Sequence, residues 1–362
     1  MLILGLDIGG ANTKAAVLSF KHKEIVDAKS YIEYFPFWEK TKTQIDELFQ
    51  RIISEFLSSK SVSLKEVDYV AVTMTAELSD AFQTKKEGVL MITEALTRVF
   101  NNKKLYFITT KNEFIKPTNV KEQYKYIAAA NWTSTALFLG NYITNSILID
   151  AGSTTIDIIP IINSIPSTIG KTDIERLLNH ELIYTGGLRA TIPSITHYVP
   201  YKGNRVRISF EKFTLISDVH RILGNITEPE YINEPADNRS KSMEDCYARL
   251  ARMICMDLNT ISKDELDIIA GFIYEKQLEL IEDELKIVYE NIKNRFSQFR
   301  EDTTFVITGL SAEFLIKPVL TRMGLEKINS YKRITNIPDN IRSSAFAVAG
   351  ALYYNFLKKP EN

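Results

Sequence analysis

The stretch GLDIGGANTKAAVL at residues 5–18 returns in altered form as LIDAGSTTIDIIPI at residues 148–161. In each copy an apolar run ends at an Asp-x-Gly turn and a second apolar run follows. This pattern predicts a β-hairpin in both places. Asp7 aligns with Asp150, an interval of about 143 residues, which is far longer than the period of a solenoid repeat. The repeat therefore predicts two related domains, each opening with strand–turn–strand.

The length of the chain agrees with that division. Its 362 residues exceed what one hydrophobic core usually serves. We predict an α/β protein with a first domain at residues 1–143 and a second at 144–362. Helical stripes at Glu39–Ser59 and Tyr126–Leu139 alternate with apolar strands in the first half. Turns and polar clusters are frequent between about residues 166 and 258, and this segment is predicted to be an insertion in the second domain.

Charge and composition exclude several classes of protein. The 44 basic and 45 acidic residues nearly cancel, which excludes a generally basic nucleic-acid binder and an acidic disordered chain. Two cysteines cannot form a disulfide framework, and the four histidines do not cluster at zinc spacing. No apolar run approaches the ~18 residues of a membrane helix, and no signal peptide is evident. A cytoplasmic protein without nucleic-acid or membrane partners is expected, with a homo-oligomer left open.

The first hairpin turn carries groups suited to phosphate. Its two glycines permit backbone angles that bring N–H groups toward a bound anion. The polar residues after them supply hydrogen-bond donors and a cation, and Asp7 at the strand end can hold Mg²⁺ through water. A tight hairpin with a Gly-Gly corner is the structural alternative. The phosphate-binding candidates in this turn are Gly9, Gly10, Asn12, Thr13 and Lys14.

The second hairpin turn repeats this chemistry. Asp150 and Asp157 lie within apolar strand residues, where a carboxylate is costly to bury unless it meets a cation or hydrogen-bond donors. Two such turns at matching positions of a repeat should face each other across one cleft and suit a Mg–phosphate ligand. Asp7 and Asp150 are the metal-binding candidates. The phosphate-binding candidates here are Gly152, Ser153, Thr154 and Thr155.

A third polar segment follows the predicted strand Asp68–Met74 and should lie at the same edge of the sheet. Glu77 and Asp80 could act as base or metal ligands there, and Lys85 or Lys86 could reach a phosphate. A solvated loop that caps a helix near Lys86 is the alternative.

Further candidates are weaker one by one. The segment Tyr-Thr-Gly-Gly-Leu-Arg, which ends at Arg189, could shape a substrate pocket. Arg189, Arg239 and Arg249 could contact anions, although each alone is more often a surface charge. The turn at Gly309 follows a strand and resembles a nucleotide-side turn. The substrate-binding candidates are Asp80, Gly186, Arg189, Arg239 and Gly309.

Two related domains that each open with an Asp-x-Gly hairpin resemble the sugar kinase/Hsp70/actin superfamily, whose domains are ribonuclease H-like. The whole chain resembles the hydantoinase/oxoprolinase-related family of archaeal and methylotroph proteins linked to tetrahydromethanopterin-dependent C1 transfer. The segments that carry this resemblance span most of the chain in order: GLDIGGANTKAA (5–16), TMTAELSDAFQTKKEGV (73–89), IDAGSTTIDIIPI (149–161), HELIYTGGLR (180–189), SDVHRILG (217–224), ADNR (236–239) and YARLARMICMD (247–257).

The resemblance implies a transferase of methanofuran biosynthesis. The implied reaction joins 5-(aminomethyl)-3-furanmethanol diphosphate to γ-glutamyltyramine, which forms an aryl ether and releases diphosphate. Mg²⁺ on the two aspartates, helped by Lys14, Lys85 or Lys86, would neutralise the leaving group. Glu77 or Asp157 would take the phenol proton. The catalytic candidates are Asp7, Asp150, Asp157, Glu77 and Lys85.

Two other functions use the same cleft. One is an ATP-dependent small-molecule kinase or a hydantoinase/oxoprolinase-like amide hydrolase, which for ATP needs an adenosine pocket near Gly309. The other is a non-enzymatic, nucleotide-gated binding protein of the Hsp70–actin kind. The irregular segment 166–258 favours a lid for small molecules over a peptide-binding domain.

Overall fold

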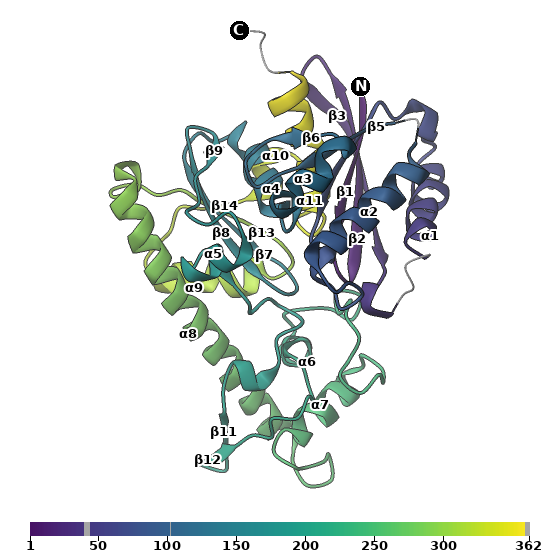
Figure 1. The fold of residues 1–362 in the computed structure, drawn as a ribbon. Helices are drawn as coiled ribbons and strands as arrows, with labels where there is room; N and C mark the ends of the chain where they lie inside the picture. The colour runs from purple at the N-terminus through teal and green to yellow at the C-terminus, as the bar shows by residue number, and fades with distance from the viewer. Residues whose placement is uncertain (40–43, 102, 359–362) are drawn as a thin grey trace.

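The first sheet is built by the amino-terminal part of the chain. The structure is a computed structural model that describes residues 1–39, 44–101 and 103–358 (Figure 1). The sheet has the strand order β3-β2-β1-β4-β5-β6, in which β1 runs antiparallel to β2 and parallel to β4. Its strands are β1 (Leu2–Ile8), β2 (Asn12–Lys21), β3 (Glu24–Tyr34), β4 (Tyr69–Met74), β5 (Lys104–Ile108) and β6 (Phe114–Ile115).

The second sheet repeats this topology. Its order is β10-β8-β7-β13-β14 with β9 beside β8, and β7 runs antiparallel to β8 and parallel to β13. The register matches as well, since Asp7 pairs with Lys14 in one hairpin and Asp150 with Asp157 in the other. The expected fold of the sugar kinase/Hsp70/actin type is confirmed. The strands are β7 (Ser146–Ala151), β8 (Ile156–Ile162), β9 (Ile165–Pro166), β10 (Leu182–Ile183), β13 (Phe305–Thr308) and β14 (Ile328–Ser330).

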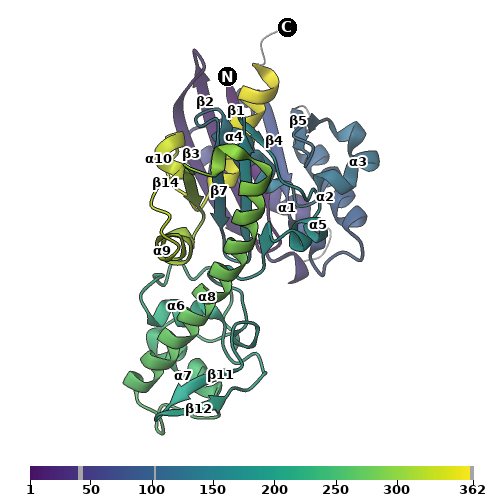
Figure 2. The ribbon, with the colours of Figure 1, turned by 90° about the vertical axis from the view of Figure 1, so that its left-hand side faces the viewer.

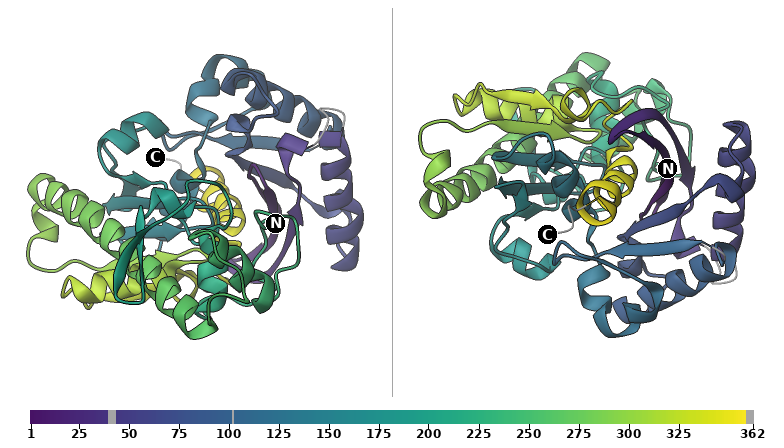
Figure 3. Two further views of the ribbon diagram at one scale, coloured as in Figure 1. Left: turned by 90° about the horizontal axis from the view of Figure 1, so that it is seen from below. Right: turned by 90° about the horizontal axis from the view of Figure 1, so that it is seen from above.

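Two buried helices, α4 (Asn131–Gly140) and α11 (Ser343–Leu352), lie between the sheets, and α11 is the yellow helix at the centre of Figure 3. The carboxy-terminal α11 packs on the first sheet so closely that a Cβ on Gly5 would lie 2.1 Å from the Ala345 carbonyl oxygen. Through this packing, a helix near the carboxy-terminal end of the chain contacts the sheet that the amino-terminal part builds. The other helices are α1 (Gln44–Arg51), α2 (Lys85–Val99), α3 (Val120–Ile127), α5 (Asp173–Leu178), α9 (Lys317–Arg322) and α10 (Tyr331–Thr335).

Two helix predictions are corrected. The stretch Tyr126–Leu139 is not one helix, because the helical conformation is interrupted between α3 and α4, where Ala129 has a φ of +50°. The helix predicted over Glu39–Ser59 is described from Gln44 onward, whereas Glu39 belongs to the 3₁₀ turn before it; residues 40–43 lie outside the described residues. The remaining short helical segments are η1 (Phe37–Glu39), η2 (Ile52–Leu57), η3 (Leu64–Glu66), η4 (Ala76–Leu78), η5 (Pro117–Asn119), η6 (Ile192–Ser194), η7 (Ser297–Phe299), η8 (Ala312–Ile316) and η9 (Tyr353–Leu357).

A separate lobe lies below the two halves in the view of Figure 2. It contains β11 (Tyr198–Tyr201), β12 (Asn204–Arg207), α6 (Ile216–Ile222) and α7 (Met243–Arg252). The long helix α8 (Lys263–Arg295) runs from this lobe to the second sheet, and its amino-terminal part completes the lobe's own apolar core. The predicted start of the insertion at about residue 166 is too early, because β10 pairs with β8 and so belongs to the second sheet.

No helix in the described ranges combines the length and the apolar character that crossing a membrane requires.

Candidate active site

A cleft of about 480 Å³ lies where the central strands of both sheets end. Gly9 follows β1 and Gly152 follows β7, so the two hairpin turns share this one cleft. Ligands commonly bind at the carboxyl ends of parallel strands in such sheets. The candidate residues that line the cleft are Asp7, Gly9, Gly10, Asn12, Lys14, Glu77, Asp80, Asp150, Gly152, Ser153, Thr154, Thr155, Asp157, Arg189 and Gly309.

The first turn closes with a hydrogen bond from the Gly9 N–H to the Asn12 carbonyl, 3.1 Å long. A Cβ added to Gly10 would meet nothing within 4 Å, so the backbone is open to a ligand there. Asp7 is buried, and its Oδ2 accepts a hydrogen bond from Ser344 and lies 3.4 Å from the Lys14 ammonium. Its Oδ1 has no hydrogen-bond partner, which leaves one buried oxygen available to a cation.

The second turn has the same closure, because the Gly152 N–H donates to the Thr155 carbonyl over 2.9 Å. The segment after β10 braces it from behind, where the Gly186 N–H donates to the Thr154 carbonyl. Gly186 therefore lies against the turn and does not line the cleft. Gly309 has a φ of +93°, and a Cβ there would lie 2.2 Å from the Ala151 carbonyl oxygen. Both glycines are needed for close approach of the backbone.

The two aspartates of the second hairpin differ in their partners. Burial, together with the charges of Asp157 and Asp7, raises the pKa of Asp150 to about 7, and Lys14 opposes this only in part. Asp157 instead accepts a 2.5 Å hydrogen bond from the fully buried Arg176. Burial still raises the pKa of Asp157 although the Arg176 charge opposes it. Asp150 is thus the member of the pair that remains open to a cation.

Glu77 lies in η4, just after β4, and is 1% exposed. Neither of its carboxylate oxygens has a hydrogen bond of normal geometry. Burial raises its pKa to about 8, and the nearby Lys85 ammonium only partly offsets this. The left-handed Ala129 lines the same cleft, and a non-glycine residue held in that conformation is often found at functional sites. Glu77 is therefore a buried carboxylate whose nearest favourable groups are backbone N–H groups and the Lys85 charge, and these do not offset its burial.

Five other candidates lie away from the cleft lining, among them Arg249, which is fully buried in α7 and forms an ion pair with Asp218. Lys85 forms a 2.9 Å ion pair with Asp173 of α5, which joins the two halves beside the cleft. Lys86 lies over the ring of Tyr124. Thr13 is fully buried in β2, and Arg239 lies in the lobe segment, 3.8 Å from Asp237. None of these positions supports direct contact with a ligand in this arrangement.

Several cleft residues were missed in the sequence. They are Trp38, Ser344, Asp173 and Arg176, whereas Tyr184 belongs to the segment that was expected to shape a substrate pocket. Of these, only Arg176 could have been expected from the sequence, because a buried Asp157 requires a cation nearby. The others come from elements far apart in the chain.

The lining of the cleft is acidic. Among the described residues it carries six carboxylates and three cationic side chains, the cations being Lys14, Arg176 and Arg189. A phosphorylated ligand therefore needs additional positive charge in order to bind. No group of three or more His, Cys, Asp and Glu side chains within the described ranges forms a complete metal site. Two carboxylates that share a metal with ligand phosphates are typical of Mg²⁺.

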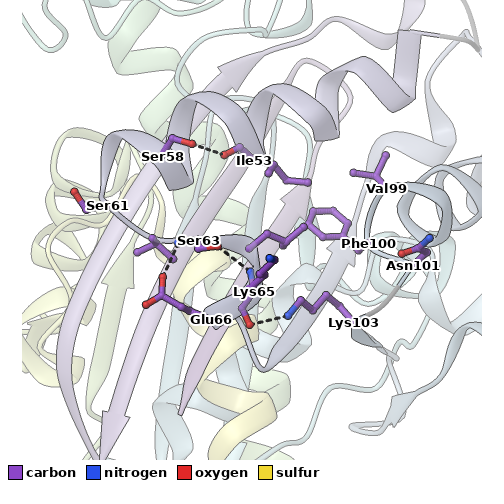
Figure 4. Close-up of a pocket in the computed structure, with 12 residues that line it drawn as sticks. Ile53, Ser58, Ser61, Ser63, Lys65, Glu66, Val99, Phe100, Asn101 and Lys103 are labelled. Atoms are coloured by element: carbon purple, nitrogen blue, oxygen red, sulfur yellow. Dashed lines mark hydrogen bonds between the residues drawn. The ribbon is translucent and has the colours of Figure 1, made fainter.

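A larger cavity of about 820 Å³ lies at the edge of the first half (Figure 4). Its polar groups bind one another. The Lys103 ammonium donates to the Lys65 carbonyl, and Glu66 accepts from the Ser63 N–H. The described residues of its lining include no pair of turns or acids like those of the cleft, which remains the candidate active site.

Comparison with known sequences defines the class. The sequence model of the hydantoinase/oxoprolinase family matches residues 68–351. The chain therefore belongs to this family, as the quoted segments predicted.

Named relatives narrow the class. One from Methanocaldococcus jannaschii is 34% identical over 355 residues, which cover 97% of this chain and 98% of the relative. Another, from Methanococcus vannielii, is 36% identical over 193 residues, which cover 53% of this chain and 81% of the relative. Both are named (4-{4-[2-(γ-L-glutamylamino)ethyl]phenoxymethyl}furan-2-yl)methanamine synthase. The expectation that the chain is an enzyme is confirmed.

A solved structure supports the fold alone. Nucleotide-free acetone carboxylase superposes with a TM-score of 0.52 at 10% identity, over 96% of this chain and 70% of that one.

Proposed function

We propose that this chain forms the aryl ether of methanofuran biosynthesis. The reaction joins 5-(aminomethyl)-3-furanmethanol diphosphate to the phenol oxygen of γ-glutamyltyramine and releases diphosphate. The name of the Methanocaldococcus jannaschii relative, which matches almost the whole chain, gives the product of this reaction and so supports it. The observation that carries the assignment is a single cleft lined by two equivalent turns, each of which follows a strand with an aspartate near its end.

The two turns suit the diphosphate leaving group. Gly10 and Gly152 present open backbone, and Ser153, Thr154 and Thr155 offer hydroxyl donors. Asp7 and Asp150 would hold Mg²⁺, and the unpartnered Asp7 Oδ1 and the excess of carboxylates fit such an ion. When bound, Mg²⁺ supplies the positive charge that lets diphosphate leave. Lys14 contributes a further fixed charge beside the same turn.

Glu77 suits the role of general base better than Asp157 does. A phenol loses its proton with a pKa of about 10, and burial brings the pKa of Glu77 to about 8. Asp157 is held by Arg176 and is less free to accept a proton. In the proposed step Glu77 takes the phenol proton, and the phenol oxygen bonds to the furanmethyl carbon. The carbon–oxygen bond to diphosphate breaks, and its electron pair leaves with diphosphate.

A paired incubation tests this function. One reaction contains the furanmethyl diphosphate, γ-glutamyltyramine and Mg²⁺, and the other contains ATP, Mg²⁺ and a panel of small acceptors. We expect ether of the correct mass, with one diphosphate released per ether, in the first reaction alone. ATP consumed in the second reaction, with no ether in the first, would contradict the proposal and favour a kinase-like activity.

A further inference from the structure

We propose that Arg189, which lies over the Trp38 ring at the mouth of the cleft, binds the α-carboxylate of the γ-glutamyl group and so selects acceptors that carry this carboxylate. This inference rests on the proposed function, because it assigns the two ends of the acceptor to two ends of the cleft. It concerns a different part of the cleft from the turns that would hold diphosphate.

The Arg189–Trp38 contact joins the two halves of the protein. The Arg189 guanidinium carbon lies 5.1 Å from the centroid of the Trp38 ring. Trp38 lies in η1 of the first half, whereas Arg189 follows the segment that braces the second turn. A planar guanidinium over an aromatic face keeps its edges free to donate a pair of hydrogen bonds.

Each partner is fixed to one of the two turns. The Phe37 N–H donates to the Gly10 carbonyl over 2.9 Å, which places Trp38 beside the first turn. The Arg189 N–H donates to the Ser153 carbonyl over 3.1 Å, which places its side chain beside the second turn. The guanidinium therefore has a set position relative to any group that the turns hold. Because its distance from the turns is set, Arg189 can favour acceptors of one length.

The charges of the cleft single out Arg189. Of the three described cationic side chains in the lining, Lys14 pairs with Asp7 and Arg176 pairs with Asp157. Within the described part of the chain the Arg189 guanidinium contacts the Trp38 ring and forms no ion pair. Since the lining is otherwise rich in carboxylates, the α-carboxylate of the acceptor would be repelled elsewhere. A carboxylate has one favourable place in this cleft.

The position of Arg189 favours the acceptor over the diphosphate. Arg189 is exposed and Trp38 is 38% exposed, so both belong to the rim of the cleft. Asp7, beside the first turn, is 4% exposed and marks the floor. The phenol oxygen must reach the carbon next to diphosphate at the floor. The opposite, γ-glutamyl end of the acceptor then extends toward the rim, where a bidentate Arg–carboxylate pair fits.

The test compares γ-glutamyltyramine with its α-carboxamide, which has nearly the same size but no negative charge. We expect the wild-type enzyme to prefer the acid by about 10- to 100-fold in kcat/KM. Arg189→Met should lower kcat/KM for the acid to the value for the amide and leave the amide unchanged. Arg189→Lys should recover part of the preference. Arg239→Met, which removes another exposed arginine outside the cleft, should retain the full preference.

Two results would overturn the inference. One is an unchanged preference for the acid in Arg189→Met. The other is an equal loss with both acceptors together with a raised KM for the furanmethyl diphosphate, which would make Arg189 a ligand of the leaving group. Absence of ether in the wild type would contradict the proposed function instead. Calorimetric titration with γ-glutamyltyramine would then decide about Arg189, since Arg189→Met should weaken its binding and equal binding would refute the assignment.

Discussion

Replacing Glu77 by glutamine should separate the catalytic role of this residue from its cost to the fold. The pKa of Glu77 is raised from 4.5 to about 8, so the folded state binds the proton more tightly than the unfolded state. Stability must therefore fall as the pH rises from 4.5 toward 8. At about 1.4 kcal/mol per pKa unit, the ceiling of this loss is about 5 kcal/mol. Relaxation and water entry reduce it, and we expect about 2 kcal/mol.

Glu77→Gln stays neutral at every pH and should not show this loss. Urea unfolding of both proteins from pH 5 to pH 9 measures the difference. The two should be almost equally stable at pH 5, and the variant should be the more stable at pH 9. A constant difference across this range, or a variant that is less stable at pH 9, would show that ionisation of buried Glu77 does not destabilise the folded protein.

The same variant tests the role of base. Wild-type ether formation should rise as the pH passes through about 8, where Glu77 loses its proton. Glu77→Gln should lower kcat by about 10²- to 10⁴-fold and abolish this rise. Glu94→Gln, an exposed change on α2, is the matched control and should keep the wild-type profile. A variant at Glu77 that keeps both the rate and the rise would exclude it as the base.

Three further variants test the cleft. Asp150→Asn should reduce Mg²⁺-dependent ether formation by about 100-fold or more without lowering the melting temperature, because the fold opposes ionisation of Asp150; an active variant would refute the metal role. Gly309→Ala should cost at least about 1–3 kcal/mol in urea unfolding, since its φ is +93° and the new Cβ would meet Ala151; an unchanged midpoint would contradict this. Arg176→Met should cost about 3–5 kcal/mol, because it leaves Asp157 buried without its cation. Adding Asp157→Asn should restore part of that stability, and no restoration would show that the ion pair is not the cause.

The twin hairpins could be predicted because their signal is local. The aspartate, the glycine and the flanking apolar strands lie within a few residues of one another, and the interval between copies identifies two related halves. The shared cleft follows from this symmetry alone. The fold then brings Asp7 and Asp150, from separate strands, to one cavity.

The rest of the site depends on contacts that local patterns cannot encode. Ser344 reaches Asp7 from 337 residues away, and Trp38 meets Arg189 from the other half of the protein. The row of alanines before α4 has a strong helix propensity, yet the left-handed Ala129 ends the helical run there. The apolar core of the lobe could not be predicted from the segment 166–258 alone, because α8, which completes this core, lies beyond that segment.

The most direct test of the account follows one oxygen atom. Single turnover is run with the furanmethyl diphosphate, Mg²⁺ and γ-glutamyltyramine whose phenol oxygen is isotopically heavy. If the cleft forms the ether, the heavy oxygen is recovered entirely in the ether, and the released diphosphate carries none of it. Heavy oxygen in a phosphorylated phenol, with no ether formed, would show that the cleft transfers phosphate to the acceptor and would contradict ether formation as its function.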